Sequence, residues 1–135
     1  MRGILLSGAV LVALAAPSAA SACTIAEQPA KERVAEADVA VYGKIVAREK
    51  MTPAPDERPG ADYRYRFRVI ETYKGKIRKR MTLLGTTDSA ACGPGLLDVG
   101  SKFGLVLNGG APWRISAGSF ITRSQLRSVR RPKRG

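Results

Sequence analysis

Residues 62–73 alternate between apolar or aromatic side chains and arginines. An alternation of period two is typical of a β-strand that buries one face and exposes the other. The stretch therefore predicts a long half-buried strand in a sheet, and it decides which side chains enter the core. The predicted inward set is Tyr63, Tyr65, Phe67 and Val69, and the predicted outward set is Arg64, Arg66 and Arg68.

Four further segments predict the rest of the sheet, and turn-forming residues separate them. The first of these segments contains Gly43, where we expect the strand to bend or bulge. Five strands with mostly short turns and few apolar residues predict a small all-β protein, a five-stranded barrel of the OB type. The additional strands are expected at 38–48, 77–84, 102–107 and 113–117.

One short helix is expected on each side of the strands. Residues 26–37 carry apolar side chains at helical spacing, and Pro29 suits the first turn of a helix. Thr122 and Gln125 have the spacing of a capping box, so a second, basic helix should follow them.

The start of the chain has the parts of a secretory signal peptide. Arg2 supplies the basic start, residues 4–16 are apolar, and Ala20-Ser21-Ala22 offers a cleavage site. The apolar run is too short to anchor the chain in a bilayer. We expect cleavage after Ala22 and a secreted or periplasmic domain of 113 residues, 23–135, without a transmembrane segment.

The two cysteines are Cys23 and Cys92. Export places them in an oxidising compartment, where one disulfide is the default and free thiols are the alternative. A cysteine after Ala-Ser-Ala also invites comparison with a bacterial lipobox, although Ala20 stands where leucine is usual. Acylation of Cys23 would exclude the disulfide.

The chain contains no histidine. This excludes Ser-His-Asp and Cys-His catalysis and every metal site built on histidine. Two cysteines alone cannot form a structural zinc site, and no carboxylate pair suggests an acid–base mechanism. The sequence therefore predicts a binding protein without a cofactor of its own, and not an enzyme.

The chain is strongly basic, with a net charge of +12. Without the predicted leader, 22 Lys and Arg face 11 Asp and Glu, which leaves a net charge of +11. Such a balance favours polyanions or anionic surfaces as partners, and a merely solvated basic face is the alternative. The candidate residues are Arg64, Arg66, Arg68, Arg78, Lys79, Arg80, Arg127, Arg130, Arg131, Lys133 and Arg134.

Several short segments occur in an order that resembles the N-terminal, netrin-like domain of the tissue inhibitors of metalloproteinases. The most specific feature is Ser89-Ala90-Ala91-Cys92-Gly93 combined with a cysteine as the first residue after the predicted cleavage site. The supporting segments are Cys23-Thr24, Ala37-Asp38-Val39, Tyr73-Lys74-Gly75 and Leu97-Asp98-Val99-Gly100. Three positions that are cysteines in the animal inhibitors are Ile25, Ala35 and Gly118 here.

The resemblance implies an OB barrel in which a disulfide joins Cys23 to Cys92. It also implies that the α-amine and carbonyl oxygen of Cys23 chelate the catalytic zinc of a partner protease, since such a zinc keeps one coordination position open. Thr24 would enter the pocket beside the metal. The neighbouring contact ridge would be formed by Ser89, Ala90, Ala91 and Cys92. The alternative is a disulfide that only stabilises the fold.

Overall fold

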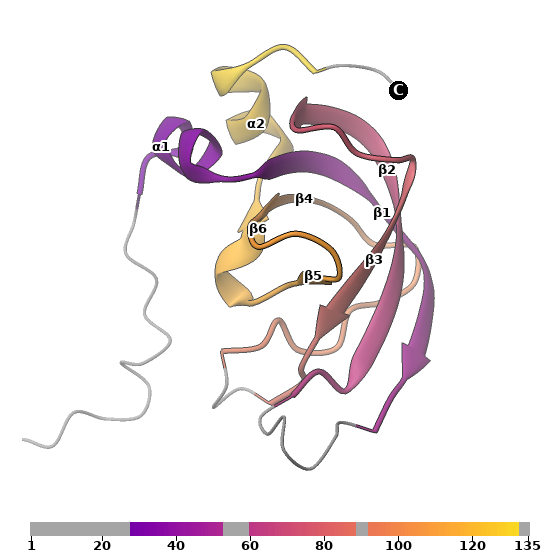
Figure 1. Ribbon diagram of the computed structural model, residues 1–135. Coiled ribbons are helices and arrows are strands. Elements are labelled where there is room, and N and C mark those ends of the chain that lie inside the picture. Colours follow the sequence, from indigo (N-terminus) through magenta and orange to yellow (C-terminus); the bar gives the residue numbers. More distant parts are fainter. Residues whose placement is uncertain (1–27, 53–59, 89–91, 133–135) are drawn as a thin grey trace, which may run out of the picture.

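The computed structural model describes residues 28–52, 60–88 and 92–132, and within them the protein is mostly β. Six strands form one curled sheet in the order β5-β3-β2-β1-β4-β6 (Figure 1). All of the strand pairs are antiparallel except β3 with β5, which are parallel. The strands are β1 Val39–Lys50, β2 Tyr63–Lys74, β3 Arg80–Gly85, β4 Lys102–Leu107, β5 Trp113–Arg114 and β6 Phe120–Ile121.

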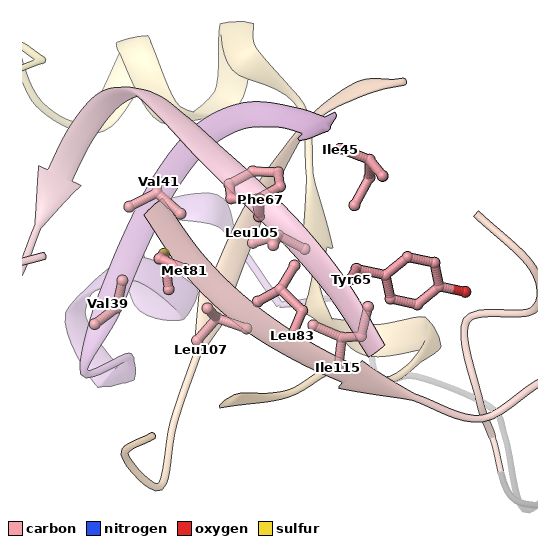
Figure 2. Packing of buried hydrophobic residues seen from close by; sticks show 10 residues of the cluster. All are labelled: Val39, Val41, Ile45, Tyr65, Phe67, Met81, Leu83, Leu105, Leu107 and Ile115. Carbon is pink, nitrogen blue, oxygen red and sulfur yellow. The ribbon is translucent and has the colours of Figure 1, made fainter. Parts of the chain in front are cut away.

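The alternation in β2 places its side chains as the sequence predicts. Tyr65 and Phe67 are fully buried, whereas the three arginines between and beside them are exposed. Tyr63 and Val69 are half-buried and pack against the same core. Figure 2 shows this core on the inner side of the curled sheet, formed by Val39, Val41, Ile45, Tyr65, Phe67, Met81, Leu83, Leu105, Leu107 and Ile115.

The irregularity expected at Gly43 is confirmed. Tyr42 pairs with Glu71 and Gly43 pairs with Val69, so Ile70 has no partner on β1. An extra residue in one strand reverses which face the following side chains occupy. Glu71 therefore lies on the outer face of the sheet beside Tyr42, although it continues the inward-facing set in the sequence.

Two short helices cover one end of this outer face. They are α1, Ala30–Glu36, and α2, Arg123–Val129, and Figure 1 shows them at one end of the sheet. A second apolar cluster lies beneath them, made of Val34, Ala40, Tyr73, Ile121 and Leu126. No helix in the described part of the chain is long and apolar enough to cross a membrane.

Most predicted boundaries differ from the observed ones by one or two residues, and three differ by more or change the element. The strand expected at 77–84 begins only at Arg80, which pairs with Arg68 at the end of the β2–β3 ladder. The strand expected at 113–117 stops at Arg114. Ser116 and Ser119 then form a capping box around the 3-10 helix Ala117–Ser119, and a sixth strand, β6, follows. The helix expected at 26–37 is shorter in the structure, where α1 covers Ala30–Glu36. Residues 26–27 lie outside the described part.

The second helix begins where the sequence predicts. The Thr122 hydroxyl accepts a hydrogen bond from the Gln125 amide, and the Gln125 side chain accepts one from the Thr122 amide. Thr122→Ala should therefore lower the free energy of unfolding by about 1 kcal/mol. Chemical denaturation measures this loss, with Ser128→Ala in the same helix as the control. An equal loss in both variants would contradict a specific capping role.

Candidate functional site

Four basic residues form a row across the outer face of the sheet. Lys44 lies opposite Lys102 on one side and opposite Arg68 on the other, and Arg68 lies opposite Arg80. Directly paired residues place their side chains on the same face, and neighbouring strands lie about 4.8 Å apart. The row therefore crosses β4, β1, β2 and β3 over about 14 Å. We call Lys44, Arg68, Arg80 and Lys102 the cationic row.

The cationic row is open to solvent and carries no compensating charge in the described part of the chain. Lys44 is half-buried and the other three residues are exposed. The ion pairs in the described part of the chain are formed by Arg48, Arg64, Arg123 and Arg127, none of which belongs to the row. Like charges directly opposite each other destabilise a sheet. A row of four is an unfavourable arrangement for stability alone, and an anionic ligand would relieve the repulsion.

The other predicted basic residues differ in their exposure and in whether another group of the protein already binds them. Arg66 is exposed and lines a hollow beside the row, together with Ala47 and Thr82. Arg64 is held by Glu49, with 2.6 Å between its terminal nitrogen and the carboxylate. Residues Arg78, Lys79 and Arg131 are exposed, Arg127 and Arg130 bind other parts of the protein, and Lys133 and Arg134 lie outside the described residues.

Beside the middle of the row, a buried carboxylate on β2 fastens α2 to the sheet. Glu71 is 3% exposed, and its Oε1 lies 2.6 Å from Arg123 Nε. Its second oxygen lies 3.6 Å from Arg127. The Arg123 guanidinium also lies 4.6 Å above the centre of the Tyr42 ring. These contacts neutralise the charge at the base of α2 and cover one face of the only aromatic ring on this part of β1.

The pKa of Glu71 lies below its ordinary value of 4.5. Burial by itself raises this pKa, but the hydrogen bond and charge of Arg123 and the charge of Arg127 outweigh that effect. Nearby, burial raises the pKa of the Tyr73 hydroxyl, which makes no well-formed hydrogen bond in the described part. Glu71 is therefore a structural anion and not a proton donor at neutral pH.

Glu71→Gln should lower the free energy of unfolding by about 1–3 kcal/mol at neutral pH, because it removes a charge-assisted hydrogen bond. A lowered folded-state pKa contributes stability above the unfolded pKa, and this contribution disappears as the pH falls through the folded value. The difference from the natural protein should therefore shrink on acidification below 4.5.

Urea denaturation at several pH values tests this prediction, with Glu49→Gln as a matched control. Glu49 also binds an arginine, but its side chain is 63% exposed. Its loss should cost less than about 1 kcal/mol. Equal losses in the two variants at neutral pH would show that burial does not strengthen the Glu71 pair.

The residues implied by the family resemblance are placed only in part. Cys23, Thr24, Ser89, Ala90 and Ala91 lie outside the described residues, so their predicted contacts stay predictions.

Cys92 is not a free cysteine, and its backbone has a φ of 55°. Its carbonyl oxygen accepts a hydrogen bond of 2.9 Å from the Ala117 amide. A Cβ on Gly93 would lie 2.0 Å from the Thr86 carbonyl oxygen, so a glycine is required after the cysteine. The Cys92-Gly93 segment is thus held tightly against β3 and the 3-10 helix.

The loop after Cys92 exposes two apolar side chains. Leu96 and Val99 are 50% and 55% exposed. The backbone between them is tethered, because the Leu97 amide donates to the Tyr65 hydroxyl and the Leu97 carbonyl accepts from Arg48. The loop therefore presents apolar side chains from a fixed backbone.

Comparison with known proteins gives no family for this chain. No protein-family model matches the sequence, and no curated protein matches it significantly.

The cationic row was only half visible in the sequence. Arg68 and Arg80 belong to the predicted basic set, but Lys44 and Lys102 were not singled out. They are 58 residues apart in the chain, and only the register of β1 with β4 brings them together. The signal that marks them is a lysine next to strongly apolar strand residues, with Lys44 between Gly43 and Ile45 and Lys102 at the start of β4.

Proposed function

We propose that this protein is an exported binding protein that holds a polyanion against the outer face of its sheet. The observation that carries the proposal is the cationic row, in which four basic side chains face solvent in register without an acidic partner in the described part. Arg66, one step along β2, extends the basic surface. The net charge of +11 that remains without the predicted leader adds long-range attraction.

The mechanism is electrostatic. A linear polyanion laid along the row meets basic groups about 4.8 Å apart. The rigid sheet fixes the positions of the side-chain stems, so little order has to be gained on binding. Added salt should weaken binding steeply, because the attraction comes from charges near solvent.

Charge reversal within the row tests the proposal. Lys44→Glu combined with Arg68→Glu should weaken the binding of a sulfated polysaccharide about a hundredfold, because two charge-assisted contacts of about 1.5 kcal/mol each are lost. The matched control is Lys31→Glu with Lys50→Glu, which changes the net charge equally at two exposed lysines off the row. Titration calorimetry at fixed salt measures both. Equal weakening would show that only net charge matters and would overturn the proposal.

A second candidate function is inhibition of a zinc metalloprotease. The Cys92-Gly93 segment favours it, because it is held rigidly and is followed by the exposed Leu96 and Val99. In this proposal Cys23 and Cys92 form a disulfide, the chain is a relative of the netrin-like inhibitor domains, and the curled sheet is an OB barrel. Cys23 and Thr24 would bind the protease zinc and its neighbouring pocket.

A further inference from the structure

A groove opens at the edge of the sheet where the cationic row ends. β6 pairs only with Gly104 and Leu105, so the Lys102–Phe103 end of β4 has no strand on that side in the described part. The groove there has a volume of about 460 Å³, within the range of small-molecule sites. Its lining comes from β1, β4, β6 and the start of α2: Tyr42, Lys102, Phe103, Gly104, Phe120, Ile121, Thr122, Arg123 and Gln125.

Lys102 belongs to both features, since it is the last member of the row and lines the groove. The groove also holds two aromatic rings, Phe103 and Phe120, which meet edge to face with centroids 5.1 Å apart. Both rings are half-buried and therefore offer apolar surface to a ligand. Both rings also pack against the inner core, where Phe103 stacks on Phe67 with centroids 5.5 Å apart. The groove therefore joins the row at Lys102 and reaches the rings only at the open edge of β4, since neighbouring residues of a strand face opposite sides of the sheet.

The groove also contains groups that can bind hydroxyls. The Gln125 carbonyl is occupied by the capping box, but its amide NH₂ donates no hydrogen bond in the described part. Gly104 lies between these groups, and a side chain there would come within 2.4 Å of the Ile121 carbonyl oxygen. The absence of a side chain at residue 104 therefore lets Ile121 and Leu126 pack closely on β4 beside the groove.

We infer that the polyanion is an acidic polysaccharide, whose charged groups lie along the cationic row while one sugar ring occupies this groove. A sugar ring has an apolar face of C–H bonds, which packs on an aromatic ring, and hydroxyls, which the Gln125 amide can bind. A single-stranded nucleic acid fits less well. Its recognition uses aromatic rings interleaved with the basic groups, and Arg123 covers the Tyr42 ring beside the row.

This inference rests on the proposed function, and its test separates the two. Two probes are used, a heparin oligosaccharide and linear inorganic polyphosphate of equal charge, because polyphosphate has no ring. Phe120→Leu keeps an apolar side chain but removes the aromatic face. It should weaken the binding of the oligosaccharide about five- to tenfold, the scale of one aromatic contact, and leave polyphosphate binding within twofold.

Gln125→Glu provides a second variant that preserves the fold, because glutamate also completes a capping box. It places a negative charge in the groove and should weaken the oligosaccharide more than polyphosphate. Unchanged oligosaccharide binding in both variants would overturn the inference that a sugar ring occupies the groove. If Lys44→Glu/Arg68→Glu then lost the binding of both probes, the proposal that the row binds polyanions would still be supported. If a single-stranded oligonucleotide bound more tightly than the oligosaccharide and Phe120→Leu weakened that binding, the ligand would be a nucleic acid and the polysaccharide inference would be wrong.

Discussion

Gly43→Ala is expected to lower the free energy of unfolding by about 3 kcal/mol or more, enough to unfold much of a small domain. A Cβ at this position would lie 2.2 Å from the Arg68 carbonyl oxygen and 2.6 Å from the Phe67 ring. Phe67 is fully buried in the core and cannot turn away. The backbone of β2 would therefore have to move, and Arg68 would move with it.

Gly85→Ala is the matched control. Gly85 is also a buried strand glycine, but a Cβ there would meet only the side chains of Pro94 and Ile115, at 3.1 and 3.2 Å. Its cost should stay below about 1.5 kcal/mol, because side chains yield more easily than backbone. Urea denaturation followed by circular dichroism measures both. A Gly43→Ala variant as stable as Gly85→Ala would show that β1 and β2 lie farther apart than described.

The part of the interior that β2 contributes was predictable, because the alternation within this strand shows which of its side chains face inward. The alternation in β2 gave the buried Tyr65 and Phe67 and the exposed arginines between them. The capping box at Thr122 likewise gave the start of α2. Both signals are local, so they depend only on residues close together in the sequence.

The features that depend on pairing between strands were not predictable. The pattern of β2 extends to Glu71, but the unpaired Ile70 moves that carboxylate to the outer face under α2. A bulge of this kind depends on the partner strand, which the local pattern does not contain. The cationic row has the same origin, because Lys44 meets Lys102 only through the β1–β4 register.

Adding one alanine before Cys23 is expected to abolish any inhibition of a zinc protease. In that second candidate function the metal is bound by the free α-amine and the carbonyl oxygen of Cys23, which close a five-membered chelate and displace the attacking water. An extra residue turns the amine into an amide, which binds zinc poorly. The loss should be at least about a thousandfold, equal to about 4 kcal/mol.

The extension should leave the free energy of unfolding nearly unchanged, because chain termini generally pack against little. Thr24→Gly should weaken inhibition less and shift the preference among proteases, because it alters only the pocket contact. Lys44→Glu with Arg68→Glu should leave inhibition intact, as the cationic row is a separate surface in this proposal. Inhibition constants of the three variants against a panel of zinc proteases decide the matter. An extended protein that inhibits as well as the natural one would rule out zinc chelation by Cys23.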